Sequence, residues 1–112
     1  MLHSIVIVLG ISSMKELTRL RKRLKTLEGH IGKIGPVMRG SVVVIGTKNK
    51  QPYFSLNKNK KTKLIYLGKA REERARELSE NYKKLIKIIE EMTDINMELL
   101  KKDYAKAKAS PE

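Results

Sequence analysis

The chain has 112 residues, and its 25 Lys or Arg residues outnumber its 12 Asp or Glu residues, which gives a formal net charge of +13. A chain of this length is expected to form a single domain spanning residues 1–112, and 40% hydrophobic residues suffice for one modest core. Because the chain has no cysteine, disulfide bonds and cysteine-ligated zinc sites are excluded.

The excess positive charge is concentrated in one stretch of the sequence. No acidic residue lies between Glu28 and Glu72, whereas ten basic residues do: Lys33, Arg39, Lys48, Lys50, Lys58, Lys60, Lys61, Lys63, Lys69 and Arg71. Like charges on a compact surface repel one another, and a polyanion relieves that repulsion. Nucleic acid is therefore the first partner that the sequence suggests.

Residues 1–12 form the most apolar segment of the chain. The segment is too short to span a bilayer, and it lacks the basic start and the small-residue cleavage site of a signal peptide. Three interpretations stay open. The β-branched run Ile5–Val8 predicts an extra strand. Alternatively, the segment is a tail used in assembly, or Met14 is the natural start and the preceding residues are a start-site artefact.

A first helix is predicted over residues 13–33. Ser13 and Glu16 have the S-x-x-E spacing of a capping box, in which both side chains satisfy amides at a helix start. Apolar residues then recur at spacings of three and four, as on the buried face of a coiled-coil helix: Leu17, Leu20, Leu24, Leu27, Ile31 and Ile34. The glycines after Glu28 and the pair Gly35–Pro36 end this helix.

A three-stranded antiparallel meander is predicted over residues 41–67. Runs of β-branched or alternating residues mark strands at 41–47, 53–57 and 61–67. The alternation places Phe54 on one face of the middle strand and Tyr53 on the other. The connections are short and rich in Lys and Asn, so neighbouring strands are expected to pair antiparallel.

A long second helix is predicted over residues 70–103, followed by a frayed tail at 104–112. Its apolar seam is read as Leu78, Tyr82, Leu85, Ile89, Met92, Asn96 and Leu99. The fold class is therefore α+β: a helix, a three-stranded meander and a long helix, with the two helices paired antiparallel like a coiled coil.

The second helix has an apolar stripe wider than one helical neighbour needs, which predicts that the rest of the stripe packs on the sheet or on a second copy of the chain in a homodimer. The candidate oligomerisation residues are Leu85, Ile89, Met92, Asn96 and Leu99. A single Asn in a buried seam can fix the register between helices. The alternative is that Asn96 faces solvent.

The candidate nucleic-acid-binding residues lie on the predicted meander and its turns: Arg39, Lys48, Lys50, Lys58, Lys60, Lys61, Lys63, Tyr53 and Tyr66. Lysines would neutralise phosphates, and a small sheet fits the major groove of duplex DNA. Alternation places Lys61 and Lys63 on one face. The two tyrosines could stack on the bases of a single strand. The alternative is that lysines keep the turns and edges of a small sheet soluble.

No catalytic or metal-binding arrangement is evident in the sequence. His3 and His30 are the only histidines and have no evident ligand partners, and the carboxylates lie among lysines on the predicted helices. We therefore expect no enzyme, no catalytic residue, no metal, no cofactor and no small-molecule substrate.

Several short motifs carry a resemblance that covers residues 35–102. They are Gly35–Ser41, Pro52–Leu56, Tyr66–Lys69, Asn81–Leu85 and Asn96–Leu100. Together they resemble a family of small uncharacterised prokaryotic proteins that are often encoded near transposases and other mobile elements. Many of those proteins carry a cysteine cluster between the first two strands. The corresponding segment here, Gly46–Gln51, has none, so no metal chemistry is carried over. The end of the third strand also resembles the three-stranded DNA-binding domains of some tyrosine recombinases, at the level of fold.

The leading hypothesis is a non-enzymatic nucleic-acid-binding accessory protein, in which duplex DNA is favoured over RNA and which serves a mobile element. The alternative is a structural or protein-interaction module built on the helical hairpin. A third interpretation is binding of single-stranded RNA through Tyr53 and Tyr66. We expect a cytoplasmic protein without membrane contact, and its Lys, Glu and Ile usage is typical of a thermophile.

Overall fold

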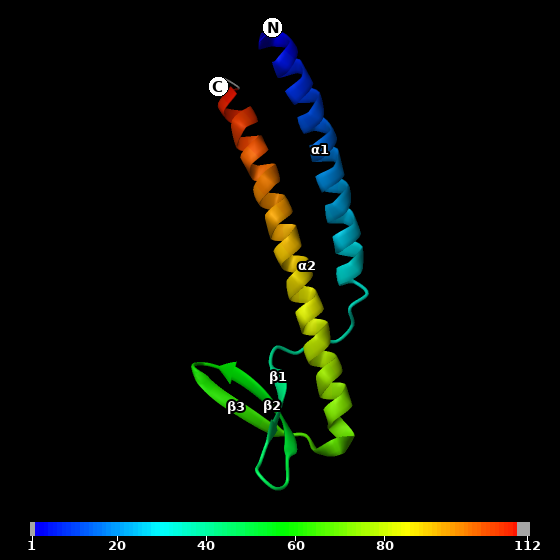
Figure 1. Ribbon diagram of the computed structural model, residues 1–112, viewed down its shortest axis with the longest axis vertical. Coiled ribbons are helices and arrows are strands. Elements are labelled where there is room, and N and C mark those ends of the chain that lie inside the picture. Colours follow the sequence, from blue (N-terminus) through cyan, green and yellow to red (C-terminus); the bar gives the residue numbers. More distant parts are fainter. Residues whose placement is uncertain (1, 110–112) are drawn as a thin grey trace. The chain divides into compact units, whose positions relative to one another are not determined.

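The computed structural model describes the backbone of residues 2–109 and the side chains of residues 14–102 (Figure 1). The elements are helix α1 (Leu2–Ile31), strands β1 (Ser41–Ile45), β2 (Gln51–Lys58) and β3 (Lys61–Tyr66), and helix α2 (Gly68–Ala109). The predicted α+β class and the order of helix, three-stranded antiparallel sheet and helix are confirmed.

The chain forms two compact units, and α2 contributes to both. The sheet unit comprises Lys33–Lys87, which includes all three strands and the first part of α2. The helical unit comprises α1, up to Gly32, and α2 from Ile88 on. The single domain expected from the chain length thus consists of two units.

Both helices are longer than the sequence analysis predicts. Helix α1 begins at Leu2, so the extra strand over Ile5–Val8 is wrong, and Ser13 lies within the helix rather than at its N-cap. The physical reason is periodicity: Leu2, Val6 and Leu9 recur at spacings of four and three, and Ser13 stands midway between Leu9 and Leu17, so the helical repeat continues and outweighs the weak strand preference of β-branched residues.

At the other end of the chain, α2 runs to Ala109, so residues 104–109 are helical and not frayed. Residues 110–112 of the predicted tail lie outside the described residues. The two remaining interpretations of residues 1–12, an assembly tail and a start-site artefact, stay predictions.

In the helical unit, α1 buries the predicted apolar face. Leu27 is fully buried, and Leu17, Leu20, Leu24 and Ile31 are partly buried. Two ion pairs link the helices: Lys102 Nζ lies 3.2 Å from Glu16 Oε2, and Arg23 Nε lies 2.5 Å from Glu91 Oε2. Glu16 of α1 pairs with Lys102 of α2, whereas Arg23, later in α1, pairs with Glu91, earlier in α2. The helices therefore run antiparallel (Figure 1).

In the helical unit, the buried seam of α2 keeps Met92 and Leu99 of the predicted seam but has Ile88 and Ile95 in place of Ile89 and Asn96. Its buried and partly buried apolar residues are Ile88, Met92, Ile95 and Leu99, again at spacings of four and three. Ile89 and Asn96, which the sequence analysis places in the seam, are exposed. Ile88 and Ile89 fit either register, but burial of Ile95 in place of Asn96 keeps the polar amide in solvent, which favours the observed one.

The sheet unit has its core on one face of the sheet. The strand order is β1-β2-β3, both pairings are antiparallel, and Phe54 lies opposite Val42 on one side and Ile65 on the other. Phe54 is 1% exposed and packs with Leu67 and with Ala75 of α2. We call this the inner face. Its alternation with an outer face that bears Tyr53 confirms the predicted two-residue pattern.

The segment before β1 is held against α2 by polar contacts. Asn81 Nδ2 donates to the Pro36 carbonyl at 2.9 Å, and Ser79 Oγ donates to the Gly40 carbonyl at 2.8 Å. Both side chains are buried. Gly40 has φ +126°, and a Cβ there would lie 2.6 Å from the Phe54 ring. This glycine lets the chain turn into β1 directly above the core.

Candidate nucleic-acid interface

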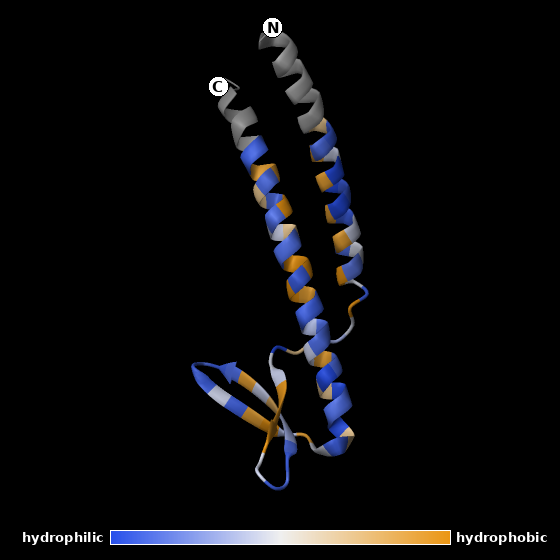
Figure 2. Ribbon diagram, viewed as in Figure 1, coloured by the Kyte–Doolittle hydropathy of each residue, from blue (hydrophilic) through white to orange (hydrophobic). Residues whose placement is uncertain are grey.

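Two lysine-bearing turns lie at opposite ends of β2. The turn between β1 and β2 carries Lys48 and Lys50, and both are exposed. The turn between β2 and β3 is formed by Asn59 and Lys60, whose φ angles are +53° and +64°. Two successive positive φ angles are typical of a type I′ hairpin turn, which matches the twist of the flanking strands. Figure 2 shows hydrophilic colours at both turns and hydrophobic positions within the strands between them.

Three lysines share the inner face next to the β2–β3 turn. The register pairs Lys58 directly with Lys61, and Lys63 with Leu56, so all three lie on the side that carries Phe54. All three are exposed. Like charges directly opposite each other on neighbouring strands destabilise a sheet by about 0.2–1 kcal/mol. The prediction that Lys61 and Lys63 share a face is confirmed.

The outer face of the sheet carries both predicted tyrosines. Tyr53 and Tyr66 are register partners, and their ring centroids lie 5.5 Å apart at 65°, an edge-to-face arrangement. The Tyr66 hydroxyl donates to Gln51 Oε1 at 3.1 Å. Leu64, two residues before Tyr66 on the same face, is 51% exposed. Sequence reasoning missed Leu64, although its spacing from Tyr66 already placed the two on one side of a strand.

The predicted site residues therefore divide between two faces. Lys61 and Lys63 lie on the inner face and the tyrosines on the outer face, so the two sets of candidate residues do not share one surface. Successive side chains alternate between the two faces of a strand, so Lys63 and Tyr66, which lie three residues apart on β3, are on opposite faces. Arg39 is tied to the sheet itself, since its Nη1 donates to the Asn57 carbonyl at 2.6 Å.

The net charge differs strongly between the two units. The sheet unit has 15 basic and four acidic residues in sequence, a net charge of +11, whereas the rest of the chain has ten and eight, a net charge of +2. All four acidic residues of the sheet unit belong to α2. The strands and their turns carry only positive charge, which strengthens the local field toward anions.

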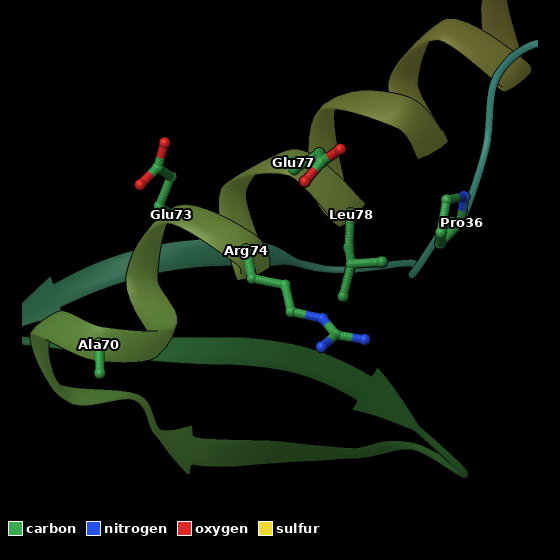
Figure 3. Close-up of a pocket in the computed structure, with 6 residues that line it drawn as sticks. All are labelled: Pro36, Ala70, Glu73, Arg74, Glu77 and Leu78. Carbon is green, nitrogen blue, oxygen red and sulfur yellow. The ribbon is translucent and has the colours of Figure 1, made fainter.

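Two pockets lie beside the first turns of α2. One has a volume of about 480 Å³ and is lined by Pro36, Ala70, Glu73, Arg74, Glu77 and Leu78. Figure 3 shows the Arg74 side chain extending toward Leu78 and Pro36, while the Glu73 carboxylate points away from it. The other has a volume of about 310 Å³ and lies against the inner face, between Phe54, Ile65 and Leu78. Neither lining includes a histidine.

Arg71 connects the end of the sheet to the start of α2. Its guanidinium donates to the carbonyls of Leu67 at 2.9 Å and Tyr66 at 2.8 Å. Arg71, one of the ten basic residues in the stretch without acidic residues, thus has a structural role, which its sequence position alone did not indicate.

Among the residues that the structure describes, no group of three or more His, Asp or Glu side chains could hold a metal ion. Within the same residues, neither helix contains a stretch long and apolar enough to cross a membrane. Comparisons of the chain with known protein families, with curated proteins and with solved structures found no match. The resemblance to proteins encoded near mobile elements stays a prediction.

Proposed function

We propose that this protein is a non-enzymatic nucleic-acid-binding accessory protein whose sheet supplies the contact. The observation that carries the proposal is the cluster of Lys58, Lys61 and Lys63 on one face, with Lys58 directly opposite Lys61. No acidic residue of the strands or turns offsets this cluster. Phosphates would remove the repulsion within it, and each neutralised phosphate would release bound counterions.

The sequence interpretation adds two parts to this proposal. Duplex DNA is the polyanion that it favours, and the resemblance over residues 35–102 suggests that the binding serves a mobile element in the cytoplasm. The separation of the helical unit, with its near-neutral charge, supports a role in which the sheet unit makes the contact and the helices hold it in place.

A salt-titrated binding assay tests the proposal. Labelled duplex DNA, single-stranded DNA and RNA are titrated with the protein between about 50 mM and about 200 mM salt. In the test variant, Lys58, Lys60, Lys61 and Lys63 are changed to Gln, which removes charge and keeps a polar side chain. We expect weaker binding to all three ligands. The salt dependence should become shallower by about 0.9 in log–log slope for each duplex phosphate that the variant no longer neutralises.

The control variant removes the same charge elsewhere. Lys15, Lys22, Lys25 and Lys101 are exposed residues of the helical unit, and their change to Gln also lowers the net charge by four. The control is expected to retain most of the affinity. If the two variants lose affinity equally, total charge and not the sheet determines binding, and the proposed contact is wrong.

A second candidate function, self-association, rests on exposed apolar residues of α2 in the helical unit. Ile89, Met97 and Leu100 are 41%, 51% and 67% exposed, and their spacing puts them along one side of the helix. A second copy of the chain could cover them. Sedimentation equilibrium distinguishes this function: a dimer that Leu100→Lys dissociates supports it, and a monomer at all concentrations rejects it.

A further inference from the structure

The outer face of the sheet combines two properties. Each of its side chains is uncharged, whereas the inner face carries Lys58, Lys61 and Lys63. Three of its apolar or aromatic side chains are also well exposed: Leu64 by 51%, Tyr66 by 50% and Ile45 by 43%. Exposed aromatic and aliphatic groups in the middle of a strongly basic surface mark a binding site for a partner with flat apolar groups and negative charge.

The register arranges these side chains in rows across the strands. Val43, Tyr53 and Tyr66 form one row, because Val43 pairs with Tyr53 and Tyr53 with Tyr66. Leu64 lies in the next row, opposite Ser55. The hydrogen bond from Tyr66 to Gln51 and the edge-to-face contact with Tyr53 hold the Tyr66 ring in one orientation. A fixed, half-exposed ring loses little side-chain entropy when a flat group packs on it.

Lysines frame this face at both ends. Lys48 and Lys50 precede β2, and Lys60 follows it in the turn to β3. The eight residues of β2 span roughly 25 Å at about 3.3 Å per residue, enough for a site of about four nucleotides, the lower end of the range for single-strand-binding domains. Charge at the ends and uncharged rings between them match a strand whose backbone is anionic and whose bases are unpaired.

We infer that the outer face is a base-stacking platform for single-stranded nucleic acid, with Tyr66, Tyr53 and Leu64 contacting bases and the lysines of both turns contacting phosphates. The inference rests on the proposed nucleic-acid-binding function and replaces duplex DNA with a single strand. In a duplex the base faces are stacked on one another, so Leu64 and Tyr66 would meet charged backbone or groove edges. In a single strand the base faces are accessible, and stacking tolerates any base.

The test compares ligands with the same number of phosphates per strand, so the duplex carries twice the total charge of either single strand. Labelled oligothymidylate, oligouridylate and a DNA duplex, each with about 12 phosphates per strand, are titrated at one salt concentration. We expect both single strands to bind more tightly than the duplex. A duplex that binds as tightly as either single strand overturns the inference while the lysine experiment can still support nucleic-acid binding. Absence of binding to every ligand overturns both.

Two variants at one position isolate the aromatic ring. Tyr66→Leu and Tyr66→Phe both remove the hydroxyl that donates to Gln51, but only Tyr66→Phe keeps the ring. Tyr66→Leu is expected to weaken single-strand binding by about fivefold to 100-fold, with Tyr66→Phe restoring most of the loss and duplex binding changed little by either. Equal affinities of the two variants for single strands would overturn the inference.

A measurement without any change to the platform complements the variants. The chain has four tyrosines, and changing Tyr82 and Tyr104 to Phe leaves only the outer-face pair as fluorophores. Stacking on bases should quench their emission with oligothymidylate and oligouridylate but not with inorganic polyphosphate, which has no bases. Quenching by polyphosphate to the same extent would contradict stacking. A change of oligomeric state in Tyr66→Leu, without loss of binding, would show that a second copy covers this face, and would also overturn the inference.

Discussion

In the helical unit, basic side chains of one helix meet acidic side chains of the other, as Arg23 does with Glu91 and Lys102 with Glu16. In the sheet unit, Lys58 faces Lys61 across two strands that contain no acidic residue. One unit therefore neutralises its charge within the fold, and the other leaves its charge for an external anion. A surface whose positive charges repel one another in the free protein and attract phosphates in a complex is typical of nucleic-acid-binding proteins.

The two units also differ in how they use apolar surface. Among the residues whose side chains are described, each unit has one large, fully buried side chain, Leu27 in the helical unit and Phe54 in the sheet unit. The helical unit buries one face of α1 against α2, whereas the sheet buries its inner face and leaves Leu64 and Tyr66 half exposed on the outer face. Because each core is small, the loss of one central side chain should remove most of a unit's stability.

The largest expected effect comes from Phe54→Ala. Removing a buried phenylalanine side chain costs about 3–5 kcal/mol, a large part of the stability of a small domain. Hydrogen exchange read by mass spectrometry should show lost protection throughout β1, β2 and β3, while the amides of α1 keep theirs. Binding of nucleic acid should be lost together with the sheet.

The matched change in the other unit is Leu27→Ala, which should cost about 2–5 kcal/mol. It is expected to deprotect α1 and leave the strands protected and nucleic-acid binding in place. If each variant instead deprotects the whole chain, the two units unfold as one, and the division between a contacting and a supporting unit breaks down.

The elements of this fold could be predicted from periodicity, because each depends on near neighbours in sequence. Alternation placed Phe54 inside and Tyr53 outside, and spacings of three and four identified the buried face of α1 from Leu17 to Ile31. One of the three interpretations of residues 1–12 places a strand at Ile5–Val8, because a short β-branched run by itself does not distinguish a strand from a helix. Only its continuation into the Leu17 repeat shows that the helix extends there.

The candidate site was less predictable, because it depends on register between strands and between helices. Lys63 and Tyr66 lie three apart on one strand, so their opposite faces follow from alternation, but the pairing of Lys58 with Lys61 depends on a two-residue turn with positive φ at Lys60. Similarly, Ile88 and Ile89 are both apolar, and which of them is buried depends on how α2 packs against α1, a helix distant in sequence.

A smaller effect is expected from Gly40→Ala. At φ +126° a side chain is strained, and its Cβ would lie 2.6 Å from the Phe54 ring and 2.7 Å from the Ser55 carbonyl oxygen. We expect a loss of about 1–3 kcal/mol in the sheet unit, measured by urea unfolding followed by tyrosine near-UV circular dichroism.

The control for this change lies in α1. A Cβ at Gly29 meets nothing within 4 Å, so Gly29→Ala should stabilise the helical unit by about 0.5–1 kcal/mol. A destabilising Gly40→Ala and a stabilising Gly29→Ala would show that the stability of each unit depends on its own local backbone. A neutral Gly40→Ala would show that the segment before β1 can move away from the core without cost.

The smallest effect concerns the ion pair between Arg23 of α1 and Glu91 of α2. The hydrogen bonds from Arg23 lower the pKa of Glu91, because they stabilise the carboxylate. A carboxyl whose folded pKa lies below its unfolded value, about 4.3 for Glu, adds stability above that value and loses it as the pH falls through the folded pKa. Glu91→Gln should therefore destabilise the helical unit at about pH 7 and match the wild type at about pH 3.

Glu90→Gln, the same change at the preceding, exposed residue, should show little difference at either pH, as measured by hydrogen exchange in α1. A deficit in Glu91→Gln that persists unchanged at about pH 3 would mean that side-chain packing, rather than charge, holds the helices at this point, and the contrast between a neutralised and an unneutralised unit would lose its clearest example.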